Sequence, residues 1–221
     1  MMDFRGETRT PRRTGQVRSA GISQVEGFVL ITVVSGLPRS GTSLMMQMIV
    51  AGGMPPLTDG LRTADENNPK GYFEWEPAKA LKQNPGAIAA AEGRVVKIIS
   101  ALLPLLPDGH VYRIVFMTRP LDEVIASQNS MLRRMGKEVP NTPQASVAAA
   151  FEKHLRETES LLGKRKNVAV LKVEHSRVLA EPTLQASRVA EFLGGELDIG
   201  RMAAQVERSL HRERSAQRAA G

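Results

Sequence analysis

The sequence predicts an α/β fold, a three-layer α/β/α sandwich around a mainly parallel sheet. Apolar, β-branched runs at 28–34 and 111–118 are typical of strands that are buried on both faces. Shorter runs at 94–99 and 167–173 predict two further strands. Segments with helical periodicity separate these runs, and strands that alternate with helices indicate parallel βαβ units.

The first predicted strand leads through a glycine turn at 36–41 into a helix at 42–50, which Gly52 and Gly53 end. Between this helix and the next strand, residues 54–76 form a loop rich in Pro, Asp, Asn and Gly. The remaining pattern predicts short helices at 77–84 and 87–92, and longer ones at 121–135, 144–162, 182–193 and 198–210.

The length of 221 residues and an apolar fraction of 42% suit one domain with a real core. We expect that domain at 27–210, between a flexible basic leader at 1–26 and a basic tail at 211–221. Residues 1–26 carry five Arg against three acids, and 201–221 carry five Arg against two, so the ends hold +5 of the net +7. Because these ends contain almost no aromatic residues, we interpret them as solvated tails and expect no nucleic-acid partner.

The chain has no cysteine, which excludes disulfides, cysteine-ligated metals and thiol nucleophiles. No segment approaches the roughly 20 apolar residues that a membrane span needs. We therefore expect a cytoplasmic protein with no membrane span.

The most informative motif is Gly36-Leu-Pro-Arg-Ser-Gly-Thr-Ser43, which follows a predicted buried strand and opens a helix. Glycines allow the backbone to approach an anion, and the N–H groups and dipole of the helix start favour negative charge. The motif therefore predicts a phosphate-binding loop formed by Gly36, Pro38, Arg39, Ser40, Gly41, Thr42 and Ser43.

The spacing of this loop equals that of a Walker A loop, but its chemistry differs. Thr42 occupies the position of the Walker lysine, and the cation lies three residues earlier, at Arg39. A Walker NTPase also requires an aspartate after a second strand to hold magnesium, whereas this strand ends in Thr118-Arg119. Both differences favour an anionic nucleotide that binds without a metal.

The loop resembles the 5′-phosphosulfate loop of the sulfotransferases, especially the arginine-bearing form of the bacterial and tyrosylprotein enzymes. Arg119 and Ser127, eight residues apart, are similar to the arginine and serine with which that family binds a 3′-phosphate. A third similarity runs from the strand at 168–173 to the helix that ends in Phe192-Leu-Gly194. The resemblance spans about 30–210 and implies a P-loop α/β fold.

The same resemblance implies an enzyme whose donor is 3′-phosphoadenosine 5′-phosphosulfate (PAPS), with no metal. It implies that Arg39 and the loop bind the 5′-phosphosulfate and that Arg119 and Ser127 bind the 3′-phosphate. Arg39 would neutralise the leaving oxygen, assisted by Thr42 and Ser43. A surface salt bridge between Arg119 and Glu123 is the alternative interpretation of that arginine.

The acceptor needs a general base. Cytosolic family members carry a lysine and a histidine two residues apart, and here Lys97 matches the lysine while Ile99 stands at the histidine position. Other branches use a glutamate, and we favour Glu74, because the aromatic residues around it could bury it and raise its pKa. Glu66 is the second candidate, and a solvated acidic loop is the alternative to both.

The sequence thus predicts a sulfotransferase that acts on an unknown hydroxyl or amine of a small molecule, carbohydrate or peptide. A P-loop kinase or NTPase and a non-catalytic nucleotide-binding protein are the alternatives. Neither the acceptor nor the oligomeric state follows from the sequence.

Overall fold

The computed structural model describes residues 30–60 and 73–206. The predicted basic leader at 1–26, the basic tail at 211–221 and Glu66 lie outside the described residues. In the described ranges, no helix combines the length and the apolar character needed to cross a membrane.

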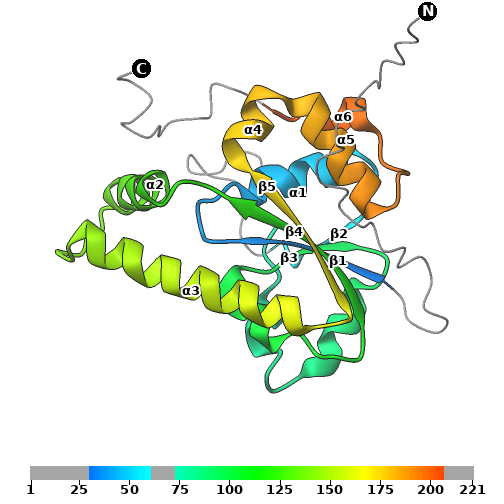
Figure 1. Ribbon diagram of the computed structural model, residues 1–221, viewed down its shortest axis with the longest axis horizontal. Coiled ribbons are helices and arrows are strands. Elements are labelled where there is room, and N and C mark those ends of the chain that lie inside the picture. Colours follow the sequence, from blue (N-terminus) through cyan, green and yellow to red (C-terminus); the bar gives the residue numbers. More distant parts are fainter. Residues whose placement is uncertain (1–29, 61–72, 207–221) are drawn as a thin grey trace, which may run out of the picture.

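Five parallel strands form the sheet in the order β2-β3-β1-β4-β5 (Figure 1). Their bounds are β1 Leu30–Gly36, β2 Pro56–Leu57, β3 Val95–Lys97, β4 Val111–Thr118 and β5 Val168–Glu174. β1 pairs with β3 on one side and along its whole length with β4 on the other, up to Gly36 opposite Met117. The carboxyl end of β1 therefore lies between the carboxyl ends of β3 and β4.

Helices cover both faces of the sheet, which confirms the predicted three-layer α/β/α architecture (Figure 1). One layer contains α1 Thr42–Ala51, α4 His175–Ala180, α5 Pro182–Leu193 and α6 Ile199–Ala203. The opposite layer contains the 3₁₀ helices η1 Glu76–Ala80, η2 Pro85–Ala91 and η3 Ser100–Leu105, together with α3 Gln144–Lys164. α2, Leu121–Arg134, follows β4 and packs against α3.

Alternation along the central strands builds a core on each face. In β4, the side chains of Tyr112, Ile114 and Phe116 join the cluster under α3 and the 3₁₀ helices. Those of Val115 and Met117 join the cluster under α1, α5 and α6. Because successive side chains of a strand point to opposite faces, a strand that is covered on both sides is expected to be mostly apolar. This explains why β1 and β4 are mostly apolar, although β4 contains the half-buried Arg113 and β1 contains the buried Thr32 and Ser35.

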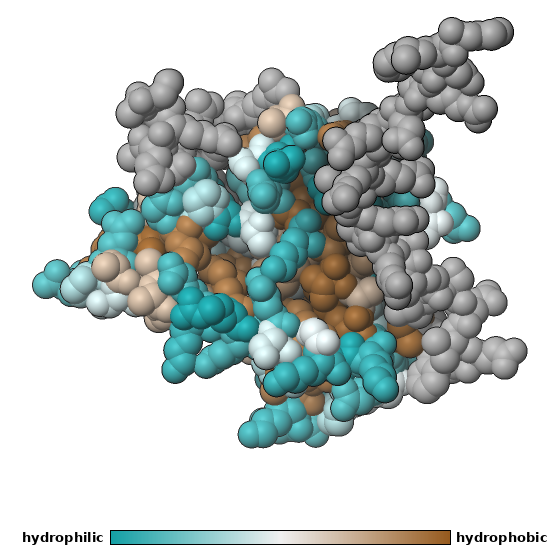
Figure 2. Space-filling model, viewed as in Figure 1, coloured by the Kyte–Doolittle hydropathy of each residue, from teal (hydrophilic) through white to brown (hydrophobic). Residues whose placement is uncertain are grey.

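β5 is covered less completely than the central strands, because it forms one edge of the sheet. Along β5 only Val173 is buried, and Val170 is 38% exposed. Figure 2 shows apolar surface on the face of the molecule that β5 crosses in Figure 1.

The element boundaries agree with the prediction to within two residues for α1, α2, α3, α5, β4 and β5. Three short elements were not predicted: β2, η3 and α4. The helix predicted at 198–210 was wrong in extent, since α6 ends at Ala203 and turn hydrogen bonds from Gln205 and Val206 close it. Met202 is the buried residue of α6, and Ile199 and Ala203 are partly buried against the same core.

Candidate functional site

The loop after β1 has the backbone conformation of an anion-binding turn. Gly36, Arg39 and Gly41 have φ values of 145°, 72° and 99°. A Cβ on Gly36 would lie 2.6 Å from the Met117 carbonyl oxygen, so the close approach of β4 requires glycine there. The Ser40 hydroxyl donates a 2.7 Å hydrogen bond to the Leu37 carbonyl and closes the turn.

The N-terminus of α1 opens directly from this loop. Gly41 is the N-cap, and the first intrahelical bond runs from the Met45 N–H to the Gly41 carbonyl. The N–H groups of Thr42 and Ser43 precede that bond, and the first turn holds no acidic residue. The positive end of the helix dipole therefore faces the loop without a carboxylate of its own helix to offset it.

Arg119 stands beside this loop, immediately after β4. Its Nη1 donates a 3.2 Å hydrogen bond to the Arg39 carbonyl, and its Nε lies 2.9 Å from Glu123 Oε2. The Arg119 and Glu123 side chains are only 8% and 7% exposed. The salt bridge that was the alternative interpretation of Arg119 is therefore present, but it is buried and it coexists with a contact to the phosphate loop.

Ser127 completes this cluster from the next turns of α2. Arg39 Nε donates a 3.1 Å hydrogen bond to Ser127 Oγ, and Ser127 is 5% exposed. The structure thus brings together the two motifs that the sequence separates by about eighty residues. The sequence assigned Arg39 only to the 5′-phosphosulfate. In the structure its guanidinium contacts Ser127, which was predicted to bind the 3′-phosphate.

Lys97 is the last residue of β3 and lies opposite Val34 of β1. The Ile98 N–H continues this pairing with a 3.0 Å hydrogen bond to the Val34 carbonyl. Lys97 is half-buried and belongs to the same carboxyl edge of the sheet as the phosphate loop. The strands on both sides of β1 therefore end in a cation, Lys97 on β3 and Arg119 directly after β4.

Glu74 lies beyond β3, at the carboxyl end of the edge strand β2. Its carbonyl accepts hydrogen bonds from the Thr58 hydroxyl at 2.9 Å and from the Asp59 N–H at 3.2 Å. The Glu74 side chain is half-buried, between the partly buried Phe73 and the buried Trp75. Glu74 is thus on the Lys97 side of the loop, opposite the Arg119 side.

Two histidines at this edge were not assigned to the site from the sequence. His175 begins α4 and is buried against the loop, so that a Cβ on Gly41 would lie 2.6 Å from its Cδ2. His154, in α3, is hydrogen-bonded through Nε2 to Ser100 Oγ at 2.8 Å. His154 shares the inward side of α3 with Phe151, Leu155 and Thr158, and this helical spacing was the signal that could have identified it.

The donor set of the site suits anions better than cations. Within residues 30–60 and 73–206, no three His, Asp or Glu side chains gather as a metal site would require. The groups that converge on the loop are backbone N–H donors, hydroxyls and guanidinium groups, and these match phosphate and sulfate oxygens.

Comparisons with known proteins identify the fold. No family model and no curated protein matches the sequence. Among solved structures, the sulfotransferase domain of the Synechococcus PCC 7002 olefin synthase has a TM-score of 0.50 and 15% identity, covering 88% of this chain and 84% of that chain. Retinol dehydratase in complex with androsterone and the inactive cofactor PAP has a TM-score of 0.46 and 17% identity, covering 79% and 62%. A sugar kinase from Janibacter sp. HTCC2649 has a TM-score of 0.43 and 13% identity, covering 83% and 98%.

We rest the fold assignment on the olefin synthase domain, whose TM-score is the highest of the three. The parallel five-stranded sheet, the layers on both faces and the glycine loop between β1 and α1 agree with it. The chain therefore has a sulfotransferase-like P-loop α/β fold.

Proposed function

We propose that this protein is a sulfotransferase that moves a sulfuryl group from PAPS to a hydroxyl or amine acceptor. The observation that carries the proposal is the cation at the carboxyl end of each strand beside β1, Lys97 and Arg119. A nucleotide with anionic groups at both of its ends, bound without magnesium, matches that charge pattern.

The phosphate loop would bind the 5′ end of the donor. Its backbone N–H groups and the hydroxyls of Thr42 and Ser43 surround the start of α1, where the helix dipole favours an anion. The remaining loop residues, Gly36, Pro38, Arg39, Ser40 and Gly41, supply the turn and its cation.

Arg119 and Ser127 would bind the 3′-phosphate. A guanidinium presents a planar fork of donors that matches phosphate oxygens, and the buried Glu123 carboxylate fixes its orientation. The hydrogen bond between Arg39 and Ser127 supports a role for Arg39 at both ends of the nucleotide, since one guanidinium lies within reach of both motifs.

The acceptor would enter on the Lys97 and Glu74 side of the loop. When bound, PAPS supplies a sulfuryl group whose negative charge is spread over its oxygens. Lys97 would contact those oxygens, and Arg39 would neutralise the charge that develops on the leaving phosphate oxygen. Glu74 is the acid on this side that could take the acceptor proton, and Glu66, which lies outside the described residues, is the second candidate. A cytoplasmic location fits such a donor and stays a prediction.

A transfer assay tests the proposal and separates it from the kinase alternative. The full-length chain is incubated with ³⁵S-PAPS and EDTA, and separately with γ-³²P-ATP and magnesium. Acceptors in both arms are 4-nitrophenol, a simple sugar and a tyrosine peptide. We expect ³⁵S transfer or release in EDTA, and its loss in Lys97→Met but not in Lys79→Met, which removes an exposed lysine. Label transfer from ATP alone would support the kinase. PAPS binding without any turnover would support a non-catalytic protein.

A further inference from the structure

A partly buried hydrogen bond joins the segment after β3 to the middle of α3. Ser100 Oγ and His154 Nε2 are 2.8 Å apart, and Ser100 is 1% exposed. Ser100 begins η3 only three residues after Lys97, so the pair lies at the carboxyl edge of the sheet. Ligand sites of open parallel sheets form at this edge.

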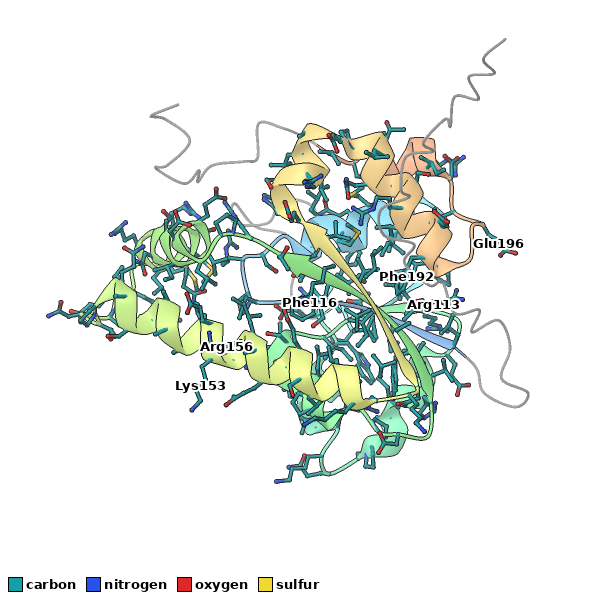
Figure 3. The ribbon with its side chains drawn as sticks, viewed as in Figure 1. Arg113, Phe116, Lys153, Arg156, Phe192 and Glu196 are labelled. Carbon is teal, nitrogen blue, oxygen red and sulfur yellow. The ribbon has the colours of Figure 1, made fainter. Side chains whose placement is uncertain are left out.

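His154 belongs to the side of α3 that faces the protein. Val147, Phe151, His154 and Thr158 recur at helical spacing and are buried or half-buried, whereas the intervening Lys153 is exposed. Figure 3 shows Lys153 pointing away from the rest of the molecule. His154 is therefore the one ionisable side chain among these four inward-facing residues, and the buried Ser100 hydroxyl holds its imidazole.

The charged groups around this pair are few. η3 carries no ionisable side chain. On α3, the neighbours of His154 pair with one another along the exposed side, Lys153 with Glu157 and Arg156 with Glu152. Lys97 is the charged residue of the preceding strand end, and Arg133 and Arg134 end α2, which packs on α3.

We infer that His154 is the general base of the transfer reaction and that Ser100 is its positioning residue. The inference rests on the proposed function. With the proton on Nε2, the imidazole donates to Ser100 Oγ, and Nδ1 keeps the lone pair that a base needs. His154 thus supplies from α3 the imidazole that is missing at Ile99.

The step balances without a further reagent. The acceptor oxygen forms a new bond to sulfur while the bond between sulfur and the bridging phosphate oxygen breaks. The phosphate oxygen takes the electron pair and leaves with the nucleotide. Nδ1 of His154 accepts the hydroxyl proton and passes it to water. Imidazole is the side chain that enzymes use most often for general acid–base catalysis.

The test compares His154→Gln, His154→Ala, Ser100→Ala and Glu74→Gln in the full-length chain. His110→Gln is the matched control, because His110 pairs with Glu92 at the opposite end of β4 from the phosphate loop. Two quantities are measured for each variant: the affinity for 3′-phosphoadenosine 5′-phosphate (PAP), and the rate of ³⁵S transfer to 4-nitrophenol or release to water across pH 5–9.

We expect His154→Gln to lower the turnover rate by roughly 100-fold or more, the usual contribution of a general base, with PAP affinity unchanged. The acid limb of the pH–rate profile should disappear in this variant. Ser100→Ala should reduce the rate less and keep the limb. Added imidazole should restore turnover to His154→Ala, which a merely structural contact between α3 and η3 does not predict.

The failures are distinguishable. If the wild type does not bind PAP, the proposed function fails and the inference fails with it. If it binds PAP but neither transfers nor releases sulfate, the proposed function and the inference both fail. If the wild type is active and His154→Gln keeps its rate and its acid limb, the inference alone is overturned. Loss of the acid limb in Glu74→Gln, with His154→Gln unaffected, would also overturn it and assign the base to Glu74.

Discussion

Arg39 Nε donates a 3.1 Å hydrogen bond to Ser127 Oγ, and this bond links the turn after β1 to the middle of α2. The loop motif and the Arg119–Ser127 motif are therefore one continuous donor surface. Arg119 strengthens the link through its hydrogen bond to the Arg39 carbonyl. A ligand that binds one motif is thus expected to contact the other.

Ser127→Ala should weaken the binding of PAP more than the binding of a nucleotide that lacks the 3′-phosphate. A lost hydrogen bond to a charged group costs about 1.5–3 kcal/mol, or roughly 10-fold to 150-fold in affinity. Calorimetry with PAP and with adenosine 5′-phosphosulfate measures both effects. Ser146→Ala, on the exposed start of α3, is the control. Equal weakening of both nucleotides by Ser127→Ala would contradict a 3′-phosphate contact.

Arg119→Ala should destabilise the protein, because it removes the cation that pairs with the buried Glu123 carboxylate. Breaking a buried ion pair on one side costs on the order of 3–5 kcal/mol. The double variant Arg119→Ala/Glu123→Gln should recover much of that stability in urea denaturation. A double variant no more stable than Arg119→Ala would show that the ion pair is not the cause.

Gly41→Ala should unfold at a lower temperature than Gly53→Ala. Both positions have positive φ, 99° and 112°, so both substitutions strain the backbone by about 1–2 kcal/mol. Only at Gly41 does the new Cβ meet a ring, 2.6 Å from His175 Cδ2. Adding His175→Ala to Gly41→Ala should remove the difference in melting temperature. If the difference in melting temperature remains, the His175 ring is not what excludes a side chain at position 41.

Tyr112→Phe should reduce the loss of folding stability that the protein shows at alkaline pH. Burial raises the pKa of Tyr112 above its usual 10.0, although the nearby Arg165 opposes the shift. The pKa of Tyr112 is higher in the folded protein than in the unfolded chain. The neutral phenol therefore contributes fully to stability below pH 10, and this contribution is lost as the pH rises towards the pKa of the folded state. Urea denaturation between pH 8 and 11 measures it. An equal decline in wild type and variant would contradict the assignment.

The sequence alone was sufficient to predict the strands and turns that are specified by their own neighbouring residues. β1 and β4 are mostly apolar because both of their faces are covered, and this pattern can be recognised without knowing which elements cover them. The same holds for the loop, since glycine at positions 36 and 41 follows from backbone conformation. The sequence placed Lys97 inside a strand predicted at 94–99, whereas in the structure β3 ends at Lys97.

The contacts that depend on distant packing could not be predicted. The orientation of Arg39 towards Ser127 depends on where α2 packs, and the Ser100–His154 pair depends on the contact of α3 with η3. β2 contains two residues and becomes a strand only because β3 pairs with it. Such features need partners that no local pattern specifies.

Binding of PAP without magnesium is the measurement that tests the central claim most directly. Thermal unfolding is followed in EDTA for the wild type, for Arg119→Ala/Glu123→Gln and for the exposed-arginine control Arg201→Ala. PAP at 100 times its dissociation constant should stabilise the wild type and the control by about 2.7 kcal/mol, and the double variant should show no shift. No response to PAP, with stabilisation by ATP and magnesium instead, would contradict the account.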